Sequence, residues 1–391
     1  SAMALLETHG LVAKSITLTA KDTITFDDEP DDPTKNPYML GYYDRLKPAL
    51  KDMLANENAI TKKTIELYAH KHTLDPFEFS LDASLFCDVI ICDYNYLFDP
   101  AVFLQRFFAE PDDANFFLID EAHNLVSRAR DMYSAEIDDA AFTQLKVALA
   151  PFKGAGLPAI KGNITKLITA FDVVRLSMDG QRERFRADPV EAFVEALDRL
   201  SQSIHEWLSG ELRTDQQAVV DLLLPVYFVC LGFLRIYDFY NDCFETKLTD
   251  DGQKLTIKEM CLDPSEFISN SLDKGRGAVL FSATLSPLPY YQDVLGGSEN
   301  SLAYRLASPF DPKRQAVIVT ENIQTTYKQR QHSLPEVIAS LTVMCGAQPG
   351  HYLVFLPSYA YLTQVAEAFE VANPDMKVVK QVGTMDAEAR A

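Results

Sequence analysis

Two adjacent acids, Asp120 and Glu121, stand directly after four apolar residues, 116–119, and Ala122 and His123 complete the tetrapeptide DEAH. The apolar run is typical of a short strand buried on both faces in a parallel sheet. Acidic side chains at the carboxyl end of such a strand lie where open α/β sheets bind ligands. One carboxylate can hold Mg²⁺ against nucleotide phosphates, and the second can orient or deprotonate the attacking water. The pattern therefore predicts nucleotide hydrolysis, against the alternative of an edge loop with a chance pair of acids.

A second group of side chains that can do chemistry is Ser282, Ala283 and Thr284, which follow a predicted buried strand within 277–288. Hydroxyl groups at a strand's end, opposite the acidic loop, can relay between a nucleotide site and a polymer site. Alone, the triplet is a weak motif, but it forms a strong pair with DEAH in the same chain. His123 can couple the acidic pair to whatever else the domain contacts.

A third segment, CDVIIC at 87–92, reads as another short buried strand that ends in Asp93, Tyr94, Asn95 and Tyr96. Two buried strands that both end in polar residues suit neighbouring strands of a parallel sheet. Asn95 with Tyr94 and Tyr96 can face a polar ligand, the amide for hydrogen bonds and the two rings for stacking. The alternative is that the tyrosines pack beneath the sheet.

Basic residues near tyrosines form a further candidate surface. Segment 41–72 is predicted to be one or two amphipathic helices and mixes lysines and histidines with tyrosines. Such a mixture can bind single-stranded nucleic acid through phosphate neutralisation and base stacking. It is equally typical of an ordinary exposed helix face. Arg128 and Arg130, which follow DEAH, either contact phosphate or pair with the acids around them.

Composition limits the class of protein. The 391 residues carry a net charge of −20 and have a pI near 4.7, which argues against a wholly basic nucleic-acid-binding surface but allows a local basic groove. The six cysteines are scattered without a CxxC pair, which favours a reducing cytoplasm and neither a disulfide framework nor a zinc site. The apolar stretch 218–236 contains Asp221, Pro225 and Arg235, so a buried helix explains it better than a membrane span.

The surrounding pattern predicts an α/β chain with one helical interruption. Segment 21–37 is an acidic, proline-rich loop, for which a Ca²⁺ site is the less favoured alternative. From 134 to about 270 the periodicity is helical, with few strand signals. The α/β pattern resumes near 277, and strands are predicted at 315–320, 351–356 and 376–382.

These residues resemble the XPD/DinG-type superfamily 2 DNA helicases over nearly the whole chain. The resemblance is carried by SITLTAKDTITF, NPYMLGYYDRLKPAL, DPFEFSLDASLFCDVIICDYNYLFDP, FFLIDEAHNLVSRARDMYSAEI, LFSATLSPL, SPFDP with TTYKQRQHS, and YLVFLPSYAYL. It implies an α/β fold: a RecA-like parallel-sheet domain with a helical Arch insertion, a small mainly helical cluster-type domain, and the start of a second RecA-like domain. The implied bounds are helicase domain 1 at 1–20, 81–133 and 271–288, the cluster-type domain at 21–80, the Arch at 134–270, and helicase domain 2 at 289–391.

The resemblance also implies roles for the site residues. Asp120 would hold Mg²⁺, Glu121 would activate water, and His123 with Ser282 and Thr284 would couple ATP hydrolysis to DNA. By position, the candidate DNA-binding residues are Tyr94, Asn95, Tyr96, Tyr327 and Arg330. The resemblance implies that the full protein is a cytoplasmic monomer with no membrane partner. It would move 5′ to 3′ on single-stranded or forked DNA. The alternatives are a catalytically inactive nucleic-acid-binding or regulatory paralogue, and an unrelated acidic scaffold.

Two departures from the family pattern shape the expectations. The positions of the four family cysteines that bind a [4Fe–4S] cluster match Thr25, Asp31 or Asp32, Asn36 and Asp75, so we expect no cluster, because iron–sulfur ligation needs thiolates. The sequence also contains no GxxxxGK[ST] phosphate loop. We expect that loop before Ser1 and motifs V and VI after Ala391, and we expect the chain by itself not to turn over ATP.

Overall fold

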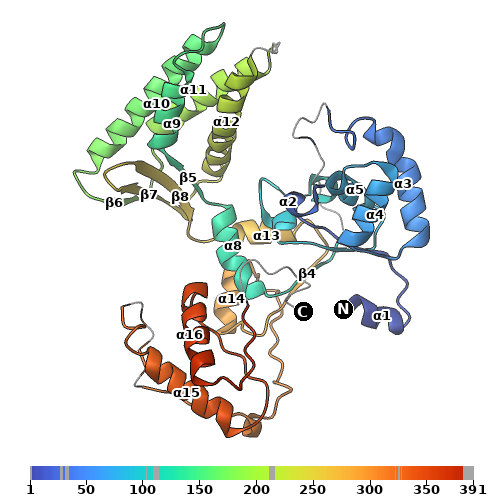
Figure 1. Cartoon of the computed structure of the whole chain (residues 1–391). Helices are drawn as coiled ribbons and strands as arrows, with labels where there is room; N and C mark the ends of the chain where they lie inside the picture. Colours follow the sequence, from blue (N-terminus) through green and yellow to red (C-terminus); the bar gives the residue numbers. More distant parts are fainter. Residues whose placement is uncertain are drawn as a thin grey trace. The chain divides into compact units, whose positions relative to one another are not determined.

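Figure 1 shows a computed structural model of the chain, which describes residues 2–26, 30, 35–102, 104–108, 114–210, 216–321, 323–324, 326 and 328–381. The chain divides into two compact units, Ser1–Ala303 and Tyr304–Ala391. Among the described residues, the first unit contains three sheets, and the second contains helices joined by irregular segments. Parallel strand pairs and many helices make the chain mixed α/β, as predicted. The finer domain bounds stay predictions.

The first sheet is parallel, with strand order β2 (Ala59–Ile60), β1 (Ser15–Thr17), β3 (Val89–Ile91). After α1 (Ala2–Thr8), its helices are α2 (Lys21–Ile24), α3 (Tyr42–Asn56), α4 (Lys62–His72) and α5 (Pro76–Ser84). Thr61 and Asp75 begin α4 and α5 because each side-chain oxygen accepts a backbone N–H of the first turn. One core joins β1 and β2 to these helices and includes Ile16, Ile60 and Phe79.

The second sheet holds the sequence motifs at the ends of its strands. Strand β4 (Phe117–Ile119) pairs in parallel with β9 (Ala278–Leu280), in a register that sets Ile119 opposite Leu280. The remaining elements are α6 (Asn95–Phe98), α7 (Gln105–Phe108), η1 (Ala122–Asn124), α8 (Leu125–Met132), α13 (Ser265–Leu272) and α14 (Leu288–Val294). Because the pairing is parallel, DEAH and SAT emerge at the same edge of the sheet.

The expectation that the short strands β3, β4 and β9 are buried was wrong for one face of each strand. Ile119 is 7% exposed and packs with α8 and α13, whereas Leu118 is 69% exposed. Its neighbour in β9, Val279, is 47% exposed, and Ile91 in β3 is 46% exposed. Since successive side chains of a strand point to opposite faces, each of these strands has one face in its core and one face that the described residues leave open.

The predicted helical interruption contains a sheet that the sequence analysis missed. Its helices are α9 (Asp139–Leu149), α10 (Leu157–Ser177), α11 (Glu191–Leu208) and α12 (Gln217–Tyr237), drawn in green and yellow-green in Figure 1. Its strands β5 (Ala135–Asp138), β6 (Glu183–Arg186), β7 (Phe244–Asp250) and β8 (Leu255–Cys261) form an antiparallel sheet in the order β5-β8-β7-β6. Strands β7 and β8 alternate buried and half-buried residues, so the helices cover one face only.

Helix α12 is, among the described residues, long and apolar enough by length and composition to cross a membrane. In this structure it contributes Val219, Leu223, Cys230 and Phe233 to the same core as the other helices of the insertion. Other apolar side chains of the helix are open, and Phe228 is 61% exposed.

The second unit differs from the predicted α/β alternation. Its elements are η3 (Pro312–Arg314), α15 (Leu334–Ala347) and α16 (Tyr359–Ala372). The strands predicted at 315–320, 351–356 and 376–382 are not formed by the described residues of those segments, and that expectation was wrong. Apolar residues of these segments are exposed, for example Val317 at 77% and Leu353 at 81%. A strand needs partners for its backbone N–H and C=O groups, and the described residues supply none here.

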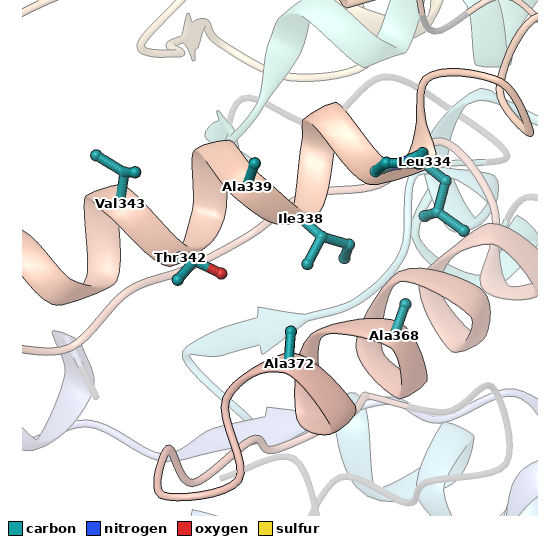
Figure 2. Close-up of a pocket in the computed structure, with 8 residues that line it drawn as sticks. Leu334, Ile338, Ala339, Thr342, Val343, Ala368 and Ala372 are labelled. Atoms are coloured by element: carbon teal, nitrogen blue, oxygen red, sulfur yellow. The ribbon is translucent and has the colours of Figure 1, made fainter.

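Helices α15 and α16 enclose an apolar groove of about 580 Å³ (Figure 2). Leu334, Ile338 and Thr342 line it from α15, and Ala368 and Ala372 line it from α16. None of the predicted catalytic or coupling residues lines this groove. The chemistry predicted from the sequence must therefore be sought at the strand ends of the first unit.

Glu259 is a buried acid in the sheet of the insertion. It lies in β8 between Ala135 of β5 and Thr246 of β7, and it is 1% exposed. Its Oε2 atom has no hydrogen-bond partner among the described residues. Burial raises the pKa of this carboxyl group from 4.5 to about 8, because a charge is poorly solvated there. The folded chain thus holds a proton near neutral pH that the unfolded chain releases.

We expect the free energy of unfolding to fall as the pH rises from about 4.5 to 8, because the folded carboxyl group keeps its proton in that window while the unfolded one loses it. The slope contributed by this group is roughly 1.4 kcal/mol per pH unit. Glu259→Gln should remove that slope, measured by urea denaturation at several pH values. The control is Glu136→Gln, whose side chain is 64% exposed. Equal slopes in Glu259→Gln and the unsubstituted chain would contradict the assignment.

Candidate active site

The turn that follows β4 presents the two acids of DEAH. Glu121 has φ 47° and ψ 41°, the left-handed conformation, which turns the chain sharply into η1. Its backbone N–H donates to Asp120 Oδ1 at 2.7 Å, and the N–H of Ala122 donates to the carbonyl of Phe281 beside β9 at 3.1 Å. Ala122 is fully buried, whereas Asp120 and Glu121 are exposed. The turn is thus anchored in the core and offers both carboxylates to solvent.

A hydrogen-bonded network joins DEAH to SAT, and the coupling role predicted for these residues stays a prediction. His123 Nδ1 lies 2.7 Å from Ser282 Oγ and 3.2 Å from Glu121 Oε2. The Ser282 hydroxyl lies 3.2 Å from Glu121 Oε2 and accepts from the backbone N–H of Thr284 at 3.2 Å. One arrangement satisfies all three polar side chains: His123 Nδ1–H donates to Ser282, and the Ser282 hydroxyl donates to Glu121. Ala283 is the exposed residue between the two hydroxyls.

The donor set of this turn suits a hard divalent cation. Carboxylate oxygens are the ligands that Mg²⁺ prefers, and the ion is commonly bound by one or two carboxylates together with substrate phosphates. Asp120 uses Oδ1 within the turn, which leaves its carboxylate able to offer Oδ2. Among the described residues no group of three or more His, Cys, Asp or Glu is placed to hold a metal. The residues therefore fit a phosphate-bound Mg²⁺ better than a cage made of protein ligands alone.

The predicted DNA-facing residues after β3 make contacts within the protein. The Tyr94 hydroxyl donates to the backbone carbonyls of Asp120 and Glu121. Asn95 Oδ1 accepts from Arg128 at 3.1 Å, and Arg128 also pairs with Asp93 at 3.0 Å. This pairing was one of the two alternatives left open for Arg128. The expectation that this strand and the DEAH strand are neighbours in one parallel sheet was wrong, because β3 pairs with β1 and β4 pairs with β9. Tyr94 reaches the acidic turn from the end of the other sheet.

The other predicted DNA-binding residues are less accessible or are not described. Tyr96 is 7% exposed and packs in the core of the first sheet, so its ring is not open to base stacking in this structure. The guanidinium of Arg330 lies over the ring of Tyr361, 5.4 Å from the ring centroid. Tyr327 lies outside the described residues. DNA binding by this set stays a prediction.

The positions that match the family's cluster cysteines carry oxygen donors that are already in use. Thr25 Oγ1 donates to the carbonyl of Lys21 at 2.6 Å, and Asn36 Oδ1 accepts from the backbone of Tyr38 at 2.9 Å. Asp75 Oδ1 caps α5 at 2.7 Å. Asn36 and Asp75 are buried, and Asp31 and Asp32 lie outside the described residues. Such hard, engaged oxygen atoms do not fit an iron–sulfur cluster, which is held by thiolates.

Comparison with known proteins finds one family model and several helicase relatives. Residues 37–142, which include DEAH, match the family DEAD_2. The ATP-dependent DNA helicase CHL1 of Coccidioides immitis is 21% identical over 295 residues, covering 65% of this chain and 34% of that protein. The general transcription and DNA repair factor IIH helicase subunit XPD of Schizosaccharomyces pombe is 21% identical over 406 residues, covering 84% of this chain and 51% of that protein.

The chain is related to the XPD/DinG-type superfamily 2 helicases. It spans about a third of the length of the CHL1 relatives it matches. Among solved structures, one titled XPD_Helicase aligns over 94% of this chain and 64% of that chain, at 15% identity and a TM-score of 0.46. Another, S. tokodaii Xpd4, aligns over 99% of this chain and 76% of that chain, at 15% identity and a TM-score of 0.42.

We expect the purified chain to contain neither stoichiometric iron nor acid-labile sulfide, even when it is isolated without oxygen. The physical reason is that Thr25, Asn36 and Asp75 offer no thiolate. Elemental analysis with a sulfide assay checks this, and the ultraviolet–visible spectrum should lack thiolate-to-iron absorption. Stoichiometric iron together with sulfide would contradict the expectation.

Proposed function

We propose that this chain is part of an ATP-dependent DNA helicase in which Asp120 and Glu121 form the hydrolytic end of the nucleotide site. The observation that carries the proposal is the network of Glu121, His123 and Ser282, which joins the ends of β4 and β9. Ser282 lies 159 residues after His123 and 161 residues after Glu121 in the sequence. An accidental pair of acids in an edge loop would not be expected to bond to a second polar motif so far away. The relatives named above are ATP-dependent DNA helicases and a helicase subunit.

In this proposal each acid has a separate role. Mg²⁺, when bound, neutralises charge on the nucleotide phosphates, and Asp120 is the residue that would hold it. The Glu121 carboxylate orients the attacking water and accepts its proton. The Ser282 hydroxyl and the His123 ring fix the direction of that carboxylate. Because Ser282 follows β9, a shift of β9 would change the position of the catalytic base.

The second part of the proposal concerns the DNA that the protein acts on. Single-stranded or forked DNA is the substrate that the family resemblance implies. A cytoplasmic monomer would move along this DNA in the 5′ to 3′ direction. The supporting observation is that segment 93–96, predicted to face DNA, contacts the acidic turn directly through Tyr94. We propose that 1–20, 81–133 and 271–288 form helicase domain 1, 21–80 the cluster-type domain, 134–270 the Arch, and 289–391 the start of domain 2.

The first test is Glu121→Gln in the full-length protein that contains this chain. Removing the base should lower kcat for ATP hydrolysis by roughly 10²–10⁴-fold while nucleotide binding is kept, since Gln cannot accept the proton. The matched control, Glu136→Gln, changes an exposed acid in β5 and should hydrolyse ATP normally. Turnover of Glu121→Gln at the unsubstituted rate would contradict the role of Glu121. A full-length protein that binds DNA but never hydrolyses ATP would favour the inactive paralogue instead.

The second test concerns coupling. Ser282→Ala removes the hydroxyl that bridges His123 and Glu121, so we expect the stimulation of ATP hydrolysis by single-stranded DNA to fall about fivefold or more, with KM for ATP unchanged. The control is Ser127→Ala, because that hydroxyl bonds only locally to the carbonyl of Asn124 in the described structure. An unchanged ratio of DNA-stimulated to basal turnover in Ser282→Ala would exclude this coupling route.

A further inference from the structure

Tyr94 connects two parts of the first unit that are far apart in sequence. It directly precedes α6, in the segment that follows β3 of the first sheet, whereas Asp120 and Glu121 follow β4 of the second. Its hydroxyl donates to the carbonyl of Glu121 at 3.1 Å and also reaches the carbonyl of Asp120. A phenol has one proton, so the two carbonyls share it. The bond is therefore made to the peptide units that carry both acids.

The peptide that Tyr94 contacts is conformationally costly. A non-glycine residue in the left-handed region costs about 1–2 kcal/mol, and such a residue persists only when its surroundings hold it. At Glu121 the surroundings include the Tyr94 hydroxyl, the N–H of Asn124 on the Glu121 carbonyl at 2.9 Å, and the N–H of Ala122 on the Phe281 carbonyl at 3.1 Å. Tyr94 thus stabilises the backbone conformation that directs the Glu121 carboxylate.

The position of Tyr94 is itself fixed from two sides. Its ring is half-buried against the core that contains Phe98, Ile119 and Ala122. Arg128 of α8, the helix that follows DEAH, bonds to Asp93 and Asn95 on either side of Tyr94.

We propose that Tyr94 is a positioning residue for Glu121: through its hydroxyl, the segment after β3 holds the left-handed turn at the angle that presents the Glu121 carboxylate. The consequence for turnover rests on the proposed function, whereas the effect on the turn does not. In the same arrangement, a strand of nucleic acid bound to segment 93–96 would act on the catalytic base through a single side chain. The Tyr94 hydroxyl then bonds to the acidic turn and is not available to hydrogen-bond a nucleic-acid base.

The first experiment is independent of catalysis. Hydrogen–deuterium exchange is measured on the 391-residue chain, and the Tyr94→Phe variant is compared with Tyr96→Phe. Tyr96 is the matched control because its hydroxyl makes only a 3.5 Å contact with the carbonyl of Thr19. We expect Tyr94→Phe to speed exchange of amides in 117–125 roughly fivefold, with peptides of β7 and β8 unchanged. Equal exchange in the two variants over 117–125 would overturn the proposal, whatever the enzymatic activity.

The second experiment measures the consequence in the full-length protein. Tyr94→Phe should lower kcat for ATP hydrolysis about tenfold with KM for ATP unchanged, since the base is misdirected but Asp120 is retained. Replacing Tyr94 by p-aminophenylalanine keeps a donor in the same place and should restore most of kcat and the slow exchange of 117–125. If the p-aminophenylalanine variant and Tyr94→Phe show the same exchange over 117–125, the Tyr94 hydroxyl does not position the turn. If exchange responds as expected but the unsubstituted protein hydrolyses no ATP, the proposed function fails and the positioning of the turn stands.

Discussion

The parallel pairing of β4 with β9 is the interaction on which the rest of the site depends. It joins residues 117–119 to 278–280, across an insertion that contains four long helices and its own sheet. Parallel pairing puts both carboxyl ends at one edge, so two short polar motifs that are far apart in the sequence meet there. The Glu121–His123–Ser282 network follows from that register, because Ile119 lies opposite Leu280. Each strand ends within two residues of that pair.

The acidic turn is exposed for chemistry but is restrained by its backbone. Its carboxylates face solvent, as a phosphate-bound cation requires, while Ala122 and Leu125 anchor the turn in the core. A left-handed residue at Glu121 would relax if its neighbours did not hold it. The N–H of Ala122 donates to the carbonyl of Phe281, which follows β9, and the Tyr94 hydroxyl, which follows β3, donates to the carbonyl of Glu121. The same turn is therefore held by contacts from both parallel sheets of the first unit.

Much of the site followed from residue types and spacing. DEAH and SAT could be assigned to strand ends because apolar runs followed by polar residues identify the binding edge of a parallel sheet. Helices over most of 139–237 followed from their 3.6-residue periodicity. The antiparallel sheet of the insertion was missed because β7 and β8 interleave charged residues such as Lys247 and Glu259 with their apolar ones, and Glu259 is buried despite its charge. Long-range bonds such as that of Tyr94 depend on the packing of two sheets, which local spacing does not encode. The strands expected after residue 315 were not formed because apolar runs specify a strand only together with a partner.

The central claim is that Asp120 and Glu121 lie beside the transferred phosphate. The most direct measurement is an experimental structure of the full-length protein with Mg²⁺ and a non-hydrolysable ATP analogue. The account predicts Mg²⁺ bound by Asp120, directly at about 2.0–2.1 Å or through one of the ion's waters, with Glu121 facing the terminal phosphate across one water. A nucleotide bound with its metal elsewhere, and with both carboxylates remote from the phosphates, would contradict it.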